Sequence, residues 1–224
     1  SKGYGYADYE EKILMKNFNR SCIGSVSKVI TSIAALKAIE EKKLELQSKI
    51  YGSNGCLRAK KYMDAIKKGI DKYSPGSKDW MNHYKAMELI HLLTHTSGFS
   101  DGVDDGESYR NYEDYHIKTL ETKRLESFTP GEGNKYSNHG MGLVGHIIHV
   151  VTGIEYRDYV KSRILRPLGI EDQVIPVKSE WNSMDAEVHT FENGKLKKKS
   201  YGIINNGLAA GGWTAAATHL VRIM

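Results

Sequence analysis

The chain has 224 residues, of which 40% are hydrophobic and 26% charged, a composition that is typical of globular proteins and excludes a disordered or fibrous chain. Its 32 basic and 27 acidic side chains give a net charge of +5. The basic residues are interspersed with acidic ones along the sequence, and this scatter excludes a nucleic-acid-binding surface. No apolar stretch approaches the ~18 residues of a membrane helix, and two cysteines are too few for a disulfide scaffold.

The first part of the chain predicts one strand and one central helix. Small and aromatic residues alternate at 3–8, which indicates an edge strand, and a turn is expected near 10–12. A helix is predicted from Ser27 to about Lys42. Because residues 29–36 carry no charge, we expect this helix to be buried on every side.

The middle of the chain is predicted to be helical. The predicted helices share a hydrophobic period near 3.6 residues, and they are expected at 57–73, 86–93, 112–125, 139–151 and 155–165. An acidic, glycine-rich stretch at 101–110 is expected to be a surface loop, and residues 130–133 a sharp turn.

The end of the chain predicts a hairpin and a last helix. Asn193-Gly194 lies inside the predicted hairpin at 188–196, since Asn-Gly favours the tight turns that join two strands. Thr214 is expected to cap a helix that runs to Met224 with no stop signal. We therefore expect the chain to be a fragment whose sheet is completed by a C-terminal segment, on the same gene or as a separate fragment or partner.

The chemically informative spot is the start of the uncharged helix. A serine hydroxyl is a poor nucleophile until a base removes its proton, and Ser25 and Lys28, three residues apart, share one helix face. Burial and the positive end of the helix dipole both favour the neutral lysine that can act as a base. The backbone N–H of Ser25 is a candidate oxyanion donor.

A second candidate group is Tyr136-Ser137-Asn138, directly after the predicted turn and before a predicted helix. The tyrosine is suited to share a proton transfer, and the asparagine amide to position substrate and Lys28. Taken singly, both this group and the S-x-x-K spacing are also explained by helix caps and a core tyrosine.

Other short motifs accompany these groups in a fixed order through nearly the whole chain: 3–8, 25–29, His91-Leu92-Leu93-Thr94-His95-Thr96-Ser97-Gly98, Pro130-Gly131, 136–138, 151–153, 167–170 and 210–212. This order resembles the serine β-lactamase and penicillin-binding-protein superfamily, whose signature includes S-x-x-K. It resembles in particular the branch of class C β-lactamases, D-alanyl-D-alanine carboxypeptidases, D-aminopeptidases and related esterases, for which the L-L-T-H-T-S-G run is highly specific.

The resemblance implies a serine hydrolase that forms an acyl-enzyme on an amide, β-lactam or ester carbonyl. Ser25 matches the family nucleophile, Lys28 its lysine partner, Tyr136 the tyrosine that acts with that lysine as general base and acid, and Asn138 the substrate-binding asparagine. The implied substrate is a small molecule or peptide. No cofactor and no metal are implied, and the family suggests a periplasmic or extracellular location.

The implied fold is α+β and β-lactamase/transpeptidase-like, with a helical domain inserted in a mixed sheet-and-helix domain whose sheet is incomplete in this chain. We expect residues 1–50 to form the N-terminal part of the α/β domain with the nucleophile helix. Residues 51–180 are expected to form the mainly helical domain, and 181–224 the hairpin and the start of the return to the α/β domain.

The sequence departs from the family pattern in two ways. The third family motif, Lys-Thr-Gly or His-x-Gly on a strand that supplies the second oxyanion N–H, has no match. Lys42 stands where relatives usually place a glycine to end the nucleophile helix, and a left-handed backbone there would cost about 1 kcal/mol.

Two alternatives remain open at this point. Histidines crowd two predicted helices, which would suit a metal-dependent hydrolase, although no H-E-x-x-H motif occurs; they are His91, His95, His139, His146 and His149. The other alternative is a catalytically impaired family member or fragment that binds ligand without turnover, because the third motif is missing.

Overall fold

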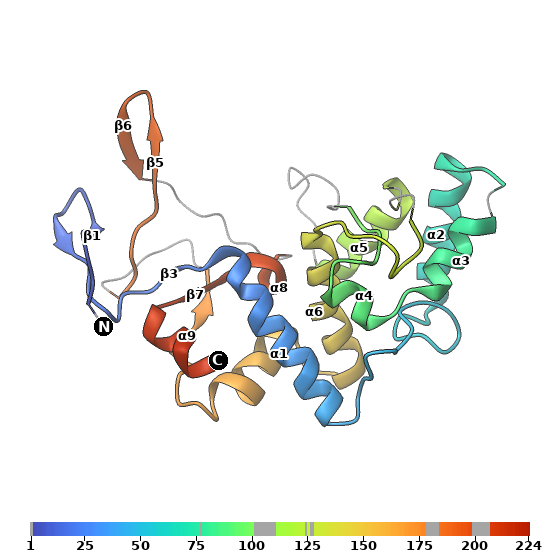
Figure 1. The fold of residues 1–224 in the computed structure, drawn as a ribbon, viewed down its shortest axis with the longest axis horizontal. Helices are drawn as coiled ribbons and strands as arrows, with labels where there is room; N and C mark the ends of the chain where they lie inside the picture. Colours follow the sequence, from blue (N-terminus) through green and yellow to red (C-terminus); the bar gives the residue numbers. More distant parts are fainter. Residues whose placement is uncertain are drawn as a thin grey trace.

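The computed structural model describes residues 2–76, 78–100, 111–123, 125, 128–177, 184–198 and 207–224. The fold is α+β: helices gather at one side of the molecule, on the right in Figure 1, and short strands at the other. Helices α1 (Ser27–Glu40) and α6 (Asn138–Thr152) lie between the two sides (Figure 1). The loop predicted at 101–110 lies outside the described residues.

Within the residues that the structure describes, the strands form three small antiparallel sheets. Strand β1 (Tyr6–Asp8) pairs with β2 (Ile13–Leu14), and β5 (His189–Glu192) pairs with β6 (Lys195–Lys198). In the third sheet, β7 (Trp213–Ala215) lies between β3 (Ser21–Cys22) and β4 (Ile175–Pro176). The predicted turn near 10–12 and the predicted hairpin around Asn193-Gly194 are both confirmed, and Asn193 and Gly194 both have positive φ angles.

The prediction that the last helix starts at Thr214 is wrong. Thr214 lies in the middle of β7, where its backbone is paired with Cys22 of β3 on one side and Ile175 of β4 on the other. The last helix, α9 (Ala217–Ile223), begins only after this strand. Pairing with two strands that are distant in sequence therefore overrides the local capping signal.

The helical side contains α2 to α5, and α7 follows α6. Their bounds are Lys60–Tyr73, Lys78–Ala86, Leu89–Leu93, Tyr112–Thr122 and Tyr156–Val160, and a π-helical turn at Lys161–Leu165 continues α7. The predicted helices are confirmed at positions close to these bounds, except that α3 was not predicted. Its sequence is mostly polar, and within it Tyr84 alone is fully buried while Trp80 and Met81 pack against the core.

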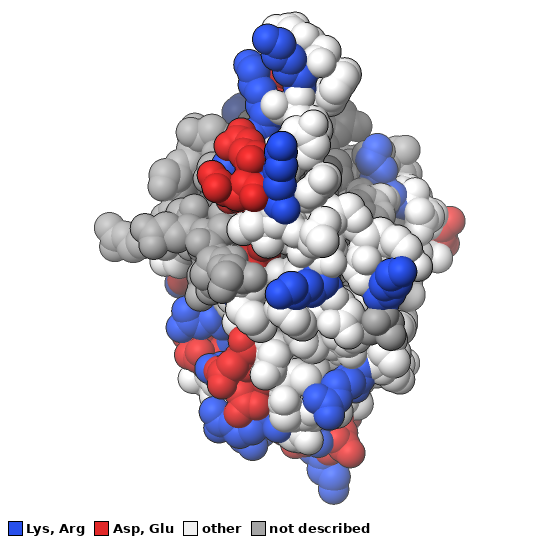
Figure 2. Space-filling view, turned by 90° about the vertical axis from the view of Figure 1, so that its left-hand side faces the viewer, with Lys and Arg blue, Asp and Glu red and all other residues white. Residues whose placement is uncertain are grey.

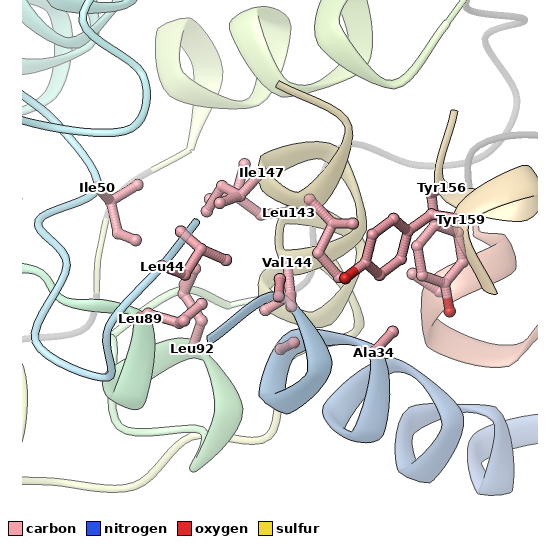
Figure 3. Close-up of a cluster of buried hydrophobic side chains, with 14 of the residues drawn as sticks. Ala34, Leu44, Ile50, Leu89, Leu92, Leu143, Val144, Ile147, Tyr156 and Tyr159 are labelled. Carbon is pink, nitrogen blue, oxygen red and sulfur yellow. The ribbon is translucent and has the colours of Figure 1, made fainter. Parts of the chain in front are cut away.

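The prediction that α1 is buried on every side is wrong. Its buried face carries small residues, Ala34, Ala35 and Ala38, whereas the side chains of Val29 and Leu36 are 46% and 54% exposed. The small side chains let α6 and the short helix α8 (Leu208–Gly211) pack closely against α1. Figure 3 shows Ala34 of α1 beside the larger core side chains that α6 and α7 contribute.

The contact between α6 and α8 depends on a glycine. A β-carbon on Gly145 of α6 would lie 2.8 Å from the β-carbon of Ala209 of α8, and 3.3 Å from the ring of Tyr156. The backbone of α8 can therefore approach α6 only because residue 145 has no side chain.

The helix α1 ends as the sequence predicts. Its last residue is Glu40, and Lys42 has a left-handed backbone with φ of 58°. The N–H groups of Lys42 and Lys43 donate to the carbonyl oxygens of Ile39 and Ala38, so the end of the helix is satisfied by backbone hydrogen bonds.

The surface carries both signs of charge. On the face shown in Figure 2, Lys and Arg side chains are interspersed with acidic and uncharged residues. Cys22 and Cys56 are free thiols. Within the described ranges, no helix combines the length and the apolar character that crossing a lipid bilayer requires.

Candidate active site

Ser25 lies where a strand turns into the central helix. After strand β3 and Ile23, a 3₁₀ turn, Gly24–Val26, leads directly into α1. Its first residue, Gly24, has a left-handed φ of 49°. Glycine adopts this backbone without strain, so the chain can turn sharply between strand and helix. The turn leaves the side chain of Ser25 exposed, two residues before the start of a helix whose first two residues, Ser27 and Lys28, are buried.

Lys28 reaches back to Ser25 from the first turn of α1. Its side-chain nitrogen, Nζ, lies 3.0 Å from Oγ of Ser25, 2.8 Å from Oδ1 of Asn138 and 2.6 Å from the carbonyl oxygen of Ala210. The residue is 8% exposed. A buried amine is thus surrounded by three oxygen acceptors, one of which is the candidate nucleophile.

Tyr136 and Asn138 approach from the other side of the site. Both lie at the start of α6, where the side chain of Ser137 caps the helix by accepting a hydrogen bond from the N–H of Gly140. The hydroxyl of Tyr136 donates to Oγ of Ser25 at 2.8 Å, and Nζ of Lys28 lies 4.9 Å from the centre of the Tyr136 ring. The structure therefore brings together all four residues singled out in the sequence.

The carbonyl of Ala210 is a contact that sequence reasoning missed. It lies in α8, and two neighbouring carbonyls are also held by groups near α1: Oγ1 of Thr31 donates to Ala209 at 2.6 Å, and Sγ of Cys22 lies 3.9 Å from the carbonyl oxygen of Gly211. A backbone acceptor has no side-chain signature. The only available signal was the run of small residues at 210–212, which permits the close approach of α8.

Thr31 belongs to a buried polar network beneath the site. Its hydroxyl lies 2.6 Å from the hydroxyl of Tyr156, which in turn accepts a hydrogen bond from Nε1 of Trp213 at 3.3 Å. The N–H of Trp213 donates to Oγ of Ser27 at 3.1 Å. This network ties α1, α7, α8 and β7 together directly under Lys28.

Several histidines of the metal-hydrolase alternative bond to neighbouring side chains. His139 Nε2 lies 2.9 Å from Nδ1 of His116, whose Nε2 lies 2.8 Å from the hydroxyl of Tyr51. His146 Nε2 lies 3.1 Å from the hydroxyl of Tyr62. Among the residues that the structure describes, no group of three or more His, Cys, Asp or Glu is placed to hold a metal ion.

Burial sets the charge of this histidine group. It lowers the pKa of His139 to about 3 and that of His146 to about 4, and it lowers the pKa of His116 as well, with the neighbouring histidines adding to that effect. These imidazoles are therefore neutral near pH 7. Their role is to fill the interface of α5 and α6 with hydrogen-bonded, stacked rings.

Comparison with known proteins gives a consistent set of similarities. The family model described as Beta-lactamase matches residues 1–224. Penicillin-binding protein 4* of Bacillus subtilis (strain 168) is 27% identical over 177 residues, a match that covers 75% of this chain and 33% of that protein. The chain thus spans about a third of the length of this curated relative.

Solved structures show the same fold. The octameric penicillin-binding protein homologue from Pyrococcus abyssi has a TM-score of 0.71 at 25% identity, and the match covers 99% of this chain and 47% of that one. EstCE1, a hydrolase with promiscuous acyltransferase activity, has a TM-score of 0.73 at 19% identity over 98% of this chain and 61% of its own. The second similarity concerns the fold alone.

Proposed function

Because the chain belongs to the Beta-lactamase family, we propose that it is a serine hydrolase that acts on an amide, β-lactam or ester carbonyl through an acyl-enzyme on Ser25. At the level of the family, penicillin-binding proteins, amidases and esterases share this fold, and most members are serine hydrolases. The proposed substrate is a small molecule or a peptide, and the proposed location is periplasmic or extracellular.

The observation that supports the proposal most directly is the pair of hydrogen bonds that meet at one oxygen. Nζ of Lys28 and the hydroxyl of Tyr136 lie 3.0 and 2.8 Å from Oγ of Ser25, within the reach that proton transfer requires. A nucleophile with a base and a second proton carrier at hydrogen-bond distance is the arrangement expected for covalent catalysis.

The surroundings of Lys28 suit it to the role of base. Asn138 and Ala210 accept two of its N–H groups, so a neutral amine in this position directs its lone pair toward the hydroxyl of Ser25. Both fixed acceptors hold the nitrogen in place beside Oγ of Ser25. Lys28 is thus oriented to receive the proton of Ser25.

In the proposed reaction, Oγ of Ser25 bonds to the carbonyl carbon, its proton passes to Lys28, and the carbonyl π electrons move onto the oxygen. When the tetrahedral intermediate collapses, the carbonyl re-forms, the bond to the leaving group breaks and that group takes a proton from Tyr136, whose hydroxyl contacts Oγ of Ser25. Water then attacks the acyl carbon and gives a proton to the Tyr136 phenolate. As the bond between the acyl carbon and Oγ breaks, Lys28 returns its proton to Ser25. The N–H of Ser25 is the proposed donor to the oxyanion, and the amide of Asn138 the proposed substrate contact.

The test is the mass of the intact protein after exposure to a penicillin and, separately, to p-nitrophenyl butyrate. We expect an acyl adduct that maps to Ser25 and is absent in Ser25→Ala. The matched control is Ser32→Ala, since Ser32 lies on the same helix and its hydroxyl donates to the carbonyl oxygen of Lys28. An adduct on Ser27, Ser97 or Ser137, or one that persists in Ser25→Ala, contradicts the proposal.

A second candidate function is ligand binding without turnover. An adduct that forms with one equivalent of ester and is never released would support this function, whereas repeated release of p-nitrophenol supports hydrolysis.

A further inference from the structure

Tyr136 belongs to a segment that has no regular secondary structure of its own. Residues 134–137 lie between a turn and the start of α6, and the Tyr136 side chain is 48% exposed. A half-exposed phenol on an irregular loop has several accessible rotamers, so contacts with neighbouring residues are needed to keep the Tyr136 hydroxyl beside Ser25.

The segment is held by the turn at residues 94–96. The side chain of Asn134 donates to the carbonyl oxygen of Thr94 at 3.2 Å. The N–H of Gly131 donates to the carbonyl oxygen of Thr96 at 2.9 Å. The two bonds nearest Tyr136 both involve His95. The N–H of Lys135 donates to the carbonyl oxygen of His95 at 2.8 Å, and the N–H of Ser137 donates to its ring nitrogen Nδ1 at 3.2 Å.

His95 also contacts the Tyr136 side chain itself. The two ring centres lie 4.6 Å apart with an angle of 33° between the ring planes. One residue therefore binds the backbone amides on both sides of Tyr136 and packs its own ring against the phenol.

The backbone of His95 makes a histidine at this position unusual. Its φ is 59°, in the left-handed region that glycine adopts most easily and that His, Asn and Asp tolerate better than other residues. A glycine would satisfy the turn but would remove both the acceptor for Ser137 and the ring against Tyr136. The side chain of His95 thus makes two contacts, with Ser137 and with Tyr136, that the turn alone does not require.

We propose that His95 is a positioning residue that holds the hydroxyl of Tyr136 against Oγ of Ser25. His95 acts through Tyr136, because it binds the amides on both sides of Tyr136 and packs against its ring. This inference rests on the proposed function, because it assigns His95 a part in that reaction.

The experiment uses two variants of His95 and one control. His95→Asn keeps a residue that tolerates the left-handed backbone and an acceptor close to the position of Nδ1, but removes the ring. His95→Phe keeps a ring and removes the acceptor. The control is His91→Asn, since His91 lies one turn earlier, in α4, and its Nδ1 accepts from the N–H of Glu88, the N-cap residue of that helix.

With p-nitrophenyl butyrate as the probe, we expect each His95 variant to lower kcat about tenfold or more with KM nearly unchanged, because misplacing a catalytic group by about 1 Å has effects of this size. In a Tyr136→Phe background the same variants should lower kcat no further. His91→Asn should leave kcat unchanged. Equal losses with and without Tyr136, or a change confined to KM, would overturn the inference.

A second readout does not depend on turnover. In protein labelled with ¹³C at the tyrosine ring ε carbons, the Tyr136 signal is identified by its absence in Tyr136→Phe. We expect this signal to lose the ring-current shift of His95 in His95→Asn, and an unchanged signal would overturn the inference. If wild-type protein releases no p-nitrophenol, the proposed function fails, and the NMR result still decides whether His95 holds Tyr136. Should one variant not fold, as judged by circular dichroism, the other carries the test.

Discussion

The hydroxyl of Tyr136 lies 2.8 Å from Oγ of Ser25, although the two residues are 111 positions apart in the chain. The contact is made by two unrelated elements, a turn before α1 and an irregular segment before α6, whose helices pack against each other. The site therefore depends on the packing of α1 against α6 as much as on the residues that meet in it.

Replacing Tyr136 with phenylalanine removes only the hydroxyl group. If Tyr136 gives the leaving group its proton, kcat for p-nitrophenyl butyrate should fall by about 10²- to 10⁴-fold, which is the usual contribution of a general acid or base. Tyr9→Phe is the control, since Tyr9 is exposed in the turn between β1 and β2. A Tyr136→Phe variant with wild-type kcat would show that Lys28 alone moves the proton.

Replacing Thr31 with valine keeps the shape of the side chain and removes its hydroxyl. Thr31 is fully buried, and its hydroxyl contacts the carbonyl of Ala209 and the hydroxyl of Tyr156. We expect the free energy of unfolding to fall by about 1–3 kcal/mol, since a buried acceptor is left without a partner. Urea denaturation measures this change.

The control for Thr31→Val is Thr122→Val. Among the described residues, the hydroxyl of Thr122 bonds to the carbonyl of Lys118 in its own helix, so this variant should change stability by less than about 0.5 kcal/mol. We also expect Thr31→Val to lower kcat, because Ala209 precedes the carbonyl that holds Lys28. Equal stability losses in the two variants would contradict the role assigned to the network.

The buried histidines make stability depend on pH. Burial lowers the pKa of His139 to about 3 and that of His146 to about 4, whereas an unfolded histidine titrates near 6.5. Below pH 6.5 the unfolded chain therefore binds protons that the folded chain does not, and the free energy of unfolding falls as the pH falls. The slope is about 1.4 kcal/mol per pH unit for each such proton.

Urea denaturation at pH 7.5, 6.5, 5.5 and 5.0 measures this slope above the range in which most carboxylates titrate. Glu113, which bears on the pKa of His146, keeps its charge over this range, because hydrogen bonds from Lys61 and Tyr62 outweigh its burial and lower its pKa. A stability that does not change between pH 7.5 and 5.0 would show that the imidazoles become charged in the folded protein.

Lys42→Gly should stabilise the protein. Lys42 has a left-handed backbone with φ of 58°, which strains a residue with a side chain by about 1 kcal/mol. Thermal or urea denaturation should show a gain of up to this size. Lys43→Gly is the control, since Lys43 does not have a positive φ and a glycine there only adds freedom to the unfolded chain. A loss of stability in both variants would contradict the strain at Lys42.

Local patterns predicted the local part of the site. Ser25 and Lys28 meet because residues three apart share a helix face, and the sequence alone places them there. That Tyr136 and Asn138 join them was implied by the resemblance to a family, because no periodicity relates residues more than a hundred positions apart. The carbonyl of Ala210 could not be predicted, since every residue has one.

The errors in the predicted fold have the same origin. Thr214 has a good local reason to cap a helix, yet it pairs with strands 39 and 192 residues earlier in the chain. The uncharged run in α1 indicates an apolar environment but does not say which side is covered, and Val29 and Leu36 are in fact exposed. Local signals are reliable where contacts are local, and long-range pairing overrides them elsewhere.

Gly145 touches none of the four candidate residues, yet its lack of a side chain bears on the geometry around Lys28. Because α8 rests against this glycine, a single added methyl group would push α8 outward, and the carbonyl of Ala210 would move with it. Lys28 would then follow its acceptor or lose it, and its distance to Ser25 would change. In the proposed reaction, a substitution at residue 145 would therefore change the position of the base, while the residues proposed to contact the substrate stay the same.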